Sequence, residues 1–428
     1  MDILNRKEIA PGIFISLITD PRFKQNRISV NLLTQLEESR ASANAVIAKV
    51  LTNSCAAYPD LRTLNARLST LYAARLSGGV GNLSDTQFVE ISVKTIGNRY
   101  ALKNGENVMN EGVEVLTECL FNPLLEGDGF KQSVTDTEKQ ACIDQIEAEL
   151  NDKRLYAVRQ ATRLLCKGEP SAVFDHGTIE GVTAVTPKSA YEAYKELLET
   201  ARIEIICVGC NGFYEVSEAL KKAFSTVKRG EMQDCHSSLS VPKPELLEFT
   251  EEMEVNQSKM VLGFKTKSGT EFDKDALAVM AKIYGGSATS MLFENVREKM
   301  SLCYYCWAKF YVGKGLLLTE CGVENDNIEK AKSEILRQLD LVKKGEFSDK
   351  ETEHALLSLE NDLRLVNDSL SGIKTWYLTH IYRCDIMEPE DMVERYKKVT
   401  RQRIIDAANS LVLDTVYVLT DKGEKTND

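Results

Sequence analysis

Hydrophobic and polar positions alternate with a period of two in several segments of the chain, which predicts β-strands. Within residues 87–96, Val89, Ile91 and Val93 alternate with charged or hydroxyl-bearing side chains. Strand-like patterns also occur at residues 12–20, 26–33, 258–266 and 414–421. Because short connections join neighbouring strands and the predicted helices lie to one side, we expect largely antiparallel sheets.

A period close to 3.6 predicts two helices between the second and third strands. The first helix carries a hydrophobic stripe formed by Ala43, Val46, Ile47, Val50 and Leu51. The second begins after Asp60, a residue type favoured as an N-cap, and we expect it to end at Gly78–Gly79.

The predicted helices follow one another in the same order in the two halves of the chain, which indicates an internal repeat. In each half a helix leads through a short loop with Gly and Phe into a long helix that opens with Thr-Glu and later reaches Asn-Asp. The long helices are expected to begin near Thr137 and Thr352, and the first to continue unbroken through residues 153–165.

This repeat predicts an α+β fold of two homologous halves, each a largely antiparallel sheet with helices packed on one face. Residues 226–250 include a polar stretch with two prolines and no periodicity, which is typical of a linker. The predicted halves are therefore residues 1–225 and 251–428.

Composition and charge exclude several classes of function. The 428 residues carry a net charge of −11 without a basic stripe, which argues against nucleic acid as a partner. No apolar run approaches the roughly 18 residues that span a bilayer, and the first residues lack the apolar segment of a secretory signal. We expect a cytoplasmic protein that binds neither nucleic acid nor membranes.

The eleven cysteines are scattered, as expected for reduced thiols packed in a core. Two pairs have C-x-x-C spacing, at 207–210 and 303–306, and each lies in a strand-like run. Metal or redox use is one interpretation of such pairs, but a structural zinc ion needs four ligands. Core packing is the interpretation that the spacing favours.

Residues 285–305, "GGSATSMLFENVREKMSLCYY", carry the most specific family resemblance in the chain. They resemble the Gly-Gly, Arg-Glu-Lys and Leu-x-Tyr signature of the pitrilysin/insulinase-type zinc peptidases. The resemblance implies two homologous α+β halves arranged as a clamshell. It also places Arg297 and Tyr304 where that family has an Arg/Tyr pair that grips the substrate. The alternative is that Arg297 pairs with a neighbouring Glu and Tyr304 is a core aromatic residue.

The zinc ligands that the resemblance would require are missing. Active members of the family carry H-x-x-E-H, and the matching positions here read Ala45-Val46-Ile47-Ala48-Lys49. The position of the third ligand is occupied by Gln145. None of the four histidines is spaced three or four residues from another. We therefore expect no catalytic residue, no metal and no cofactor in this chain, with zinc only in a partner chain.

The resemblance therefore implies a non-catalytic, substrate-binding subunit, inactive alone, of a two-chain zinc peptidase. Arg297 and Tyr304 would be supplied to a zinc-bearing homologue that acts on a peptide or protein. A homodimer is an alternative assembly that the sequence leaves open. Residues 138–157, "EKQACIDQIEAELNDKRLYA", and 297–305, "REKMSLCYY", resemble the YmfF-like branch of the family. That resemblance implies a role in the 5-aminopentanol modification of elongation factor P. The alternative function is a peptide- or protein-binding or assembly factor that keeps the peptidase fold without proteolysis.

Overall fold

A computed structural model describes residues 4–102, 105–210, 212–267 and 272–421. Contacts divide the chain into two compact units, each a mixture of sheet and helices, which confirms the predicted α+β class. Of the described residues, unit 1 comprises those within 1–147, 173–236 and 367–386, and unit 2 comprises those within 148–172, 237–366 and 387–428. No helix in the described residues is long and apolar enough to cross a membrane.

The sheet of unit 1 has six strands in the order β1-β2-β8-β3-β5-β4. Every neighbouring pair is antiparallel except β2 and β8. The strands span Asn5–Ala10 (β1), Ile13–Thr19 (β2), Gln25–Gln35 (β3), Arg75–Leu83 (β4), Thr86–Ile96 (β5) and Arg202–Gly209 (β8). A small separate hairpin joins Leu125–Glu126 (β6) to Gly129–Phe130 (β7).

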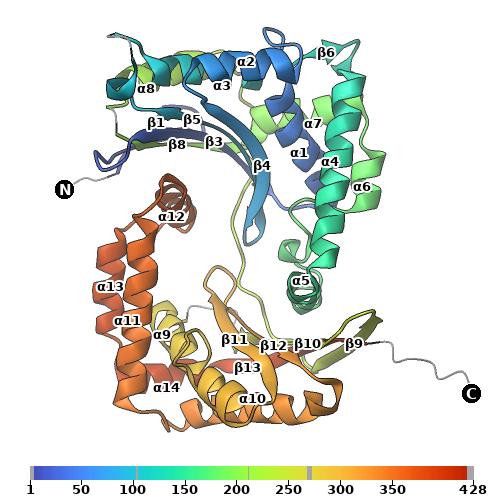
Figure 1. The fold of residues 1–428 in the computed structure, drawn as a ribbon, viewed down its shortest axis with the longest axis vertical. Helices are drawn as coiled ribbons and strands as arrows, with labels where there is room; N and C mark the ends of the chain where they lie inside the picture. Colours follow the sequence, from blue (N-terminus) through green and yellow to red (C-terminus); the bar gives the residue numbers. More distant parts are fainter. Residues whose placement is uncertain (1–3, 103–104, 211, 268–271, 422–428) are drawn as a thin grey trace, which may run out of the picture. The chain divides into compact units, whose positions relative to one another are not determined.

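Helices cover one face of this sheet and bury the larger hydrophobic core of the unit (Figure 1). The helices of this region span Glu38–Asn53 (α1), Leu61–Thr70 (α2), Val108–Phe121 (α3), Gln132–Asn151 (α4), Ile179–Ala184 (α6), Pro187–Thr200 (α7) and Tyr214–Phe224 (α8), with a 3₁₀ turn at Asn98–Tyr100 (η1). Asp60 is the N-cap of α2, as predicted, and its side chain accepts a hydrogen bond from the Thr63 backbone N–H. The opposite face is covered by α12 (Leu370–Tyr382), whose apolar side chains meet β2, β3 and β8.

Two predictions about helix ends were wrong. Gly78–Gly79 lies inside strand β4 and ends no helix. A Cβ on Gly78 would stand 1.9 Å from the carbonyl oxygen of Ala48 in α1. Glycine is needed there for close packing of α1, not for ending a helix. The long first-half helix begins at Gln132 and breaks at Asp152. The Asp152 carboxylate accepts hydrogen bonds from the backbone N–H groups of Arg154 and Leu155 and so caps the start of a new helix.

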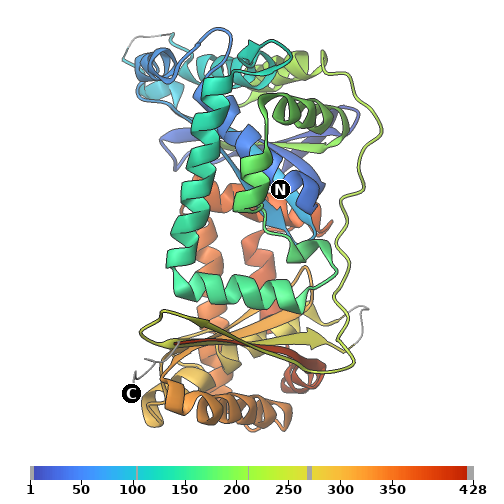
Figure 2. The same ribbon diagram turned by 90° about the vertical axis from the view of Figure 1, so that its right-hand side faces the viewer.

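The sheet of unit 2 has five strands in the order β11-β12-β10-β13-β9. All neighbouring pairs are antiparallel except β13 and β9. The strands span Leu247–Met253 (β9), Ser258–Thr266 (β10), Cys303–Tyr311 (β11), Leu316–Val323 (β12) and Leu411–Asp421 (β13). The predicted linker thus ends in a strand, whereas residues 228–246 contain neither helix nor strand (Figure 2).

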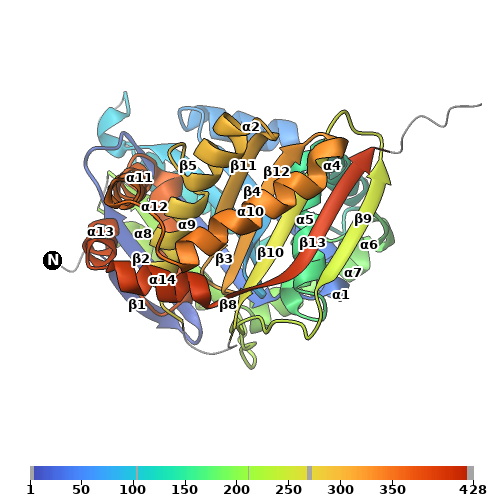
Figure 3. The ribbon, with the colours of Figure 1, turned by 90° about the horizontal axis from the view of Figure 1, so that it is seen from below.

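Helices cover one face of the second sheet, as seen from below in Figure 3. They span Lys274–Tyr284 (α9), Leu292–Lys299 (η3), Ile328–Lys343 (α10), Asp349–Val366 (α11), Pro389–Lys397 (α13) and Arg401–Asn409 (α14), with a 3₁₀ turn at Asn325–Asn327 (η4). The other face is covered by α5 (Lys153–Leu165), followed by a 3₁₀ turn at Pro170–Ala172 (η2).

The two units exchange one helix each. Helix α5 precedes residues 226–250 in sequence but belongs to unit 2, and α12 follows them but belongs to unit 1. Each exchanged helix is also held by charge: Arg154 of α5 donates two hydrogen bonds to Glu320, and Lys374 of α12 donates one to Glu90. The compact units are therefore not continuous segments of sequence on either side of one linker.

Candidate functional site

Arg297 lies on an irregular helix. Residues Leu292–Lys299 form a π-helix (η3), a rare conformation that is frequent at functional sites. Its buried residues, Leu292 and Val296, anchor it on the core of unit 2, while the Arg297 side chain is 40% exposed. The Arg297 guanidinium carbon stands 4.6 Å from the centre of the Phe293 ring, and Nη1 is 3.4 Å from Glu298 Oε1.

Tyr304 lies on a β-bulge just after this helix. Ser301 has a positive φ of 49°, a conformation that side chains rarely adopt, and it turns the chain into β11. Between Cys303 and Tyr305 the pairing register of β11 with β12 shifts by one residue. Tyr304 has no Cα partner in this ladder, and its side chain is 64% exposed. The bulge therefore directs Tyr304 away from the sheet.

The surroundings of Tyr304 separate the two interpretations drawn from the sequence. An aromatic residue in the core would be buried, which Tyr304 is not. Its hydroxyl donates a 2.8 Å hydrogen bond to Glu324 Oε1, and this bond and the carboxylate charge raise the pKa of Tyr304. Arg297 does pair with a neighbouring Glu, as the alternative expected, but both partners are solvent-accessible. The pair thus presents an accessible cation and an accessible phenol.

The positions that match the missing zinc ligands have no ligand chemistry. Ala45 and Ala48 are buried within α1, and Gln145 is exposed on α4. Burial raises the pKa of the nearby Cys142 thiol to about 11, opposed by the positive charge of Lys49. Three side chains that are close enough to share a metal ion do occur within the described residues, but they lie in unit 2.

That group is formed by Cys303, Cys306 and Cys321, whose sulfur atoms all lie within 4.8 Å of one another. Sequence spacing identified Cys303 and Cys306 but missed Cys321, because Cys321 comes from the neighbouring strand β12. Hydrogen bonds with the thiols of Cys306 and Cys321 hold the pKa of Cys303 below its usual range. A cross-strand neighbour of this kind cannot be read from spacing along one strand.

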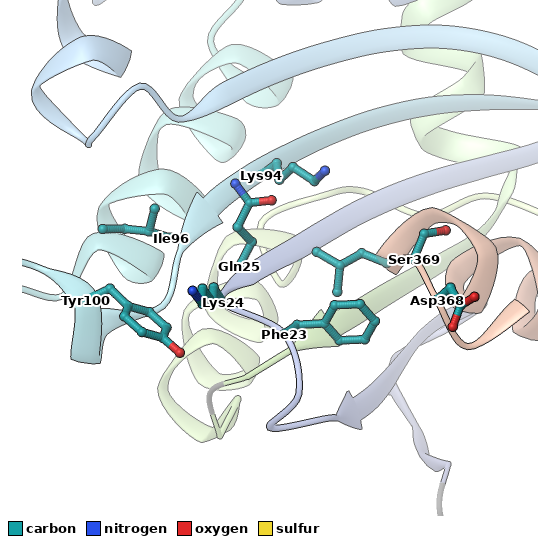
Figure 4. Close-up of a pocket in the computed structure, with 9 residues that line it drawn as sticks. Phe23, Lys24, Gln25, Lys94, Ile96, Tyr100, Asp368 and Ser369 are labelled. Carbon is teal, nitrogen blue, oxygen red and sulfur yellow. The ribbon is translucent and has the colours of Figure 1, made fainter. Parts of the chain in front are cut away.

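A separate open cavity of about 530 Å³ lies within unit 1 (Figure 4). It is bounded by the start of β3, the end of β5 and the first turn of α12, with Phe23, Gln25, Lys94, Tyr100 and Asp368 in its wall. Both lysine and carboxylate side chains line it, so its charge does not select one class of ligand. Sequence reasoning did not predict this cavity, because α12 lies far along the chain from β3 and β5.

Comparison with known proteins shows which family the chain resembles. Residues 184–359, which include Arg297 and Tyr304, match the family model described as "Peptidase M16 inactive domain". A Bacillus subtilis protein named "Probable inactive metalloprotease YmfF" is 28% identical over 95% of this chain and 96% of its own length. The chain is therefore similar to M16 peptidases, through the family model over residues 184–359 and through this relative over nearly its whole length. This is the pitrilysin/insulinase-type family that residues 285–305 resemble.

Solved structures show the same fold over the whole chain. A conserved protein from Enterococcus faecalis V583 superposes with a TM-score of 0.90 and 23% identity over 100% of both chains. An M16 inactive domain from Pseudomonas fluorescens superposes with a TM-score of 0.78 and 14% identity over 98% of both chains. A shorter match, 29% identical over 32% of this chain and 34% of the relative, is an uncharacterized zinc protease YmxG of Bacillus subtilis. M16 architecture therefore accounts for both units.

Proposed function

We propose that this M16-like protein is a non-catalytic, substrate-binding subunit of a two-chain zinc peptidase. The observation that carries the proposal is a contrast between its two candidate sites. The zinc positions hold Ala45, Ala48, Lys49 and Gln145, none of which is a good ligand for a dication. Arg297 and Tyr304, in contrast, remain solvent-accessible on a π-helix and a β-bulge. Irregular backbone that exposes polar side chains is typical of functional sites.

The exposed pair suits recognition of a peptide carbonyl. A guanidinium and a phenol both donate hydrogen bonds, and a donor that carries charge contributes about 1.5–3 kcal/mol. In a complex with a zinc-bearing homologue, the same donors would stabilise the oxyanion that develops during hydrolysis. Since Tyr304 now donates to Glu324, binding of a carbonyl by Tyr304 requires exchange of that bond.

A second feature supports a peptide as the ligand. Strand β4 forms an edge of the first sheet, and within the described residues it pairs only with β5. Edge strands can bind extended peptides through their free backbone groups. The central residue of β4, Gly79, has open space where a Cβ would stand, so no neighbouring atom covers that face of the strand at this position. The ligand class that we propose is therefore an extended segment of peptide or protein.

The proposal is tested by mixing the purified chain with a zinc-bearing M16 homologue from the same organism and measuring peptide cleavage. We expect cleavage by the mixture and none by this chain alone. Arg297→Ala should lower kcat/KM of the mixture between about tenfold and about 150-fold, the equivalent of one charged hydrogen bond. Tyr304→Phe should lower it as well.

Arg364→Ala is the matched control, because Arg364 is also an exposed arginine paired with a glutamate on a helix of unit 2. It should leave the rate unchanged. An unaffected rate with Arg297→Ala would contradict the proposed role of the pair. Tight peptide binding with no cleavage by any combination of chains would instead favour the assembly-factor alternative.

The finer parts of the proposal come from the family resemblance. They are a cytoplasmic location, a heterodimer with the zinc-bearing chain, and a role in 5-aminopentanol modification of elongation factor P. Deletion of the gene should then change the mass of elongation factor P isolated from the cells. Complementation with the Arg297→Ala variant should fail to restore that mass, whereas Arg364→Ala should restore it. An unchanged mass after deletion would exclude this role without affecting the peptide-binding proposal.

A further inference from the structure

Three cysteines gather in the core of unit 2 beside the π-helix. Cys306 and Cys321 lie directly opposite each other on β11 and β12 and are 1% and 0% exposed. Cys303 lies at the start of β11, is 9% exposed, and completes a triangle of sulfur atoms within 4.8 Å of one another. All three belong to the hydrophobic core that η3 covers with Leu292 and Val296.

The β-bulge is the cause of this gathering. In a regular strand, residues three apart point to opposite faces. Along β11, Cys306 and Ala308 face the helix-covered core, whereas Tyr305 lies against Arg154 of α5 on the other face. Without the bulge Cys303 would share the face of Tyr305, and the register shift returns it to the face of Cys306. The irregularity that exposes Tyr304 therefore also brings three thiols together.

We propose that Cys303, Cys306 and Cys321 bind one soft monovalent metal ion, Cu(I), through three thiolates. Metal–sulfur bonds of about 2.3 Å place the sulfur atoms of a trigonal site about 4 Å apart, so only a small inward movement is required. Thiolates select soft ions such as Cu(I) and zinc, but structural zinc takes four ligands. No fourth His, Cys, Asp or Glu joins the group within the described residues.

Neighbouring groups suit a soft, negatively charged complex. Binding releases three thiol protons to solvent and forms three metal–sulfur bonds, which leaves a net charge of −2. The positive charges of Arg297 and Lys259 act on Cys303 and Cys321. Met260 lies in register with Cys321 on β10 and is buried in the same core, so its thioether is a further soft group beside the site. The partly exposed Cys303 is the point of entry.

The test is an anaerobic titration of the reduced full-length chain with Cu(I) in competition with a chromophoric Cu(I) chelator. One tightly held ion per chain is expected. X-ray absorption of the loaded protein should show a first shell of three sulfur atoms. Cys306→Ala and Cys321→Ala should weaken binding more than about 100-fold, since even the loss of an outer-shell partner typically costs 10- to 100-fold. Thermal unfolding and circular dichroism of both variants determine whether the fold is retained.

Cys207→Ala is the matched control, because Cys207 is also a fully buried strand cysteine but belongs to unit 1. It should bind Cu(I) like the natural sequence. If Cys306→Ala fails to fold, protection of Cys303 from alkylation by Cu(I) in the unaltered chain tests the same site. The proposal would be overturned if Cys306→Ala bound Cu(I) as tightly as the natural sequence. It would also be overturned if the chain bound stoichiometric zinc through these cysteines and a fourth ligand, or if the chain isolated without oxidant held a disulfide among them.

Discussion

At the scale of single residues, the hydrogen bond from Tyr304 to Glu324 leads to a prediction about the pKa of Tyr304 that can be tested without a partner chain. The carboxylate of Glu324 disfavours the phenolate and so raises the pKa of Tyr304. Glu324→Gln removes that charge, and the pKa of Tyr304 should fall toward the ordinary value of 10.0. A pH titration of ring-labelled tyrosine followed by NMR measures this shift.

Tyr304→Phe identifies the resonance of Tyr304 in that experiment, because that variant lacks the titrating hydroxyl. A Tyr304 titration that Glu324→Gln leaves unmoved would mean that the hydrogen bond is absent in solution.

Residue chemistry predicted part of the candidate site but not its geometry. The loss of ligands at Ala45, Ala48 and Lys49 follows directly from their side chains, and Asp60 is an N-cap because its carboxylate can accept from a backbone N–H. The bulge at Tyr304 is different. Its position depends on the pairing of β11 with β12, so no local sequence pattern predicts that the Tyr304 phenol is exposed or that Cys321 lies beside Cys306.

At the scale of elements, α1 and β4 pack so closely that one glycine cannot be replaced. A Cβ at Gly78 would overlap the Ala48 carbonyl oxygen, whereas a Cβ at Gly79 meets nothing within 4 Å. Gly78→Ala should therefore lower the free energy of unfolding by roughly 1–3 kcal/mol, a typical cost of overpacking. Gly79→Ala in the same strand should cost little or be slightly stabilising. Urea unfolding of both variants measures the difference, and equal stabilities would contradict the close contact.

Helix α12 depends on a buried ion pair that makes unit 1 sensitive to acid. Burial pushes the pKa of Glu90 upward, but the charges of Lys374 and Arg27 outweigh it and hold the pKa below 4.5. A carboxylate with a lowered folded-state pKa stabilises the fold above its unfolded pKa, and that contribution disappears as the pH falls through the folded value. Stability of the natural chain should therefore decline in acid partly because Glu90 is protonated.

Glu90→Gln leaves Lys374, which is 4% exposed, without its carboxylate. The expected loss at neutral pH is about 3–5 kcal/mol, the range for breaking a buried pair from one side. The variant should also show a shallower decline of stability between neutral and acid pH. Glu394→Gln, which alters an exposed carboxylate paired with Lys397, is the control and should change little. Urea unfolding at several pH values tests both points, and equal slopes for Glu90→Gln and the natural chain would contradict them.

At the scale of the whole molecule, the α+β class and most elements were predictable, but the exchange of α5 and α12 was not. Both helices follow a long helix, and their apolar faces are evident from the sequence, yet such a face does not specify which sheet it covers. The partners are set by distant residues: Leu165 packs over Gly263 of unit 2, whereas Ile373 belongs to the core with Ile206 of unit 1. Hydrophobic periodicity alone cannot predict which residues pack together when they are so far apart in the sequence.

The exchange predicts that the two units fold as one cooperative system. A fragment of residues 1–236 lacks α12, and a fragment of residues 237–428 lacks α5, so each would expose one apolar sheet face. Each fragment alone should bind a hydrophobic dye strongly and aggregate, whereas coexpressed fragments should form a stable complex. The intact chain should unfold in a single calorimetric transition whose calorimetric and van't Hoff enthalpies agree. Two separated transitions, or a soluble, cooperatively folded single fragment, would show that the exchanged helices do not couple the units.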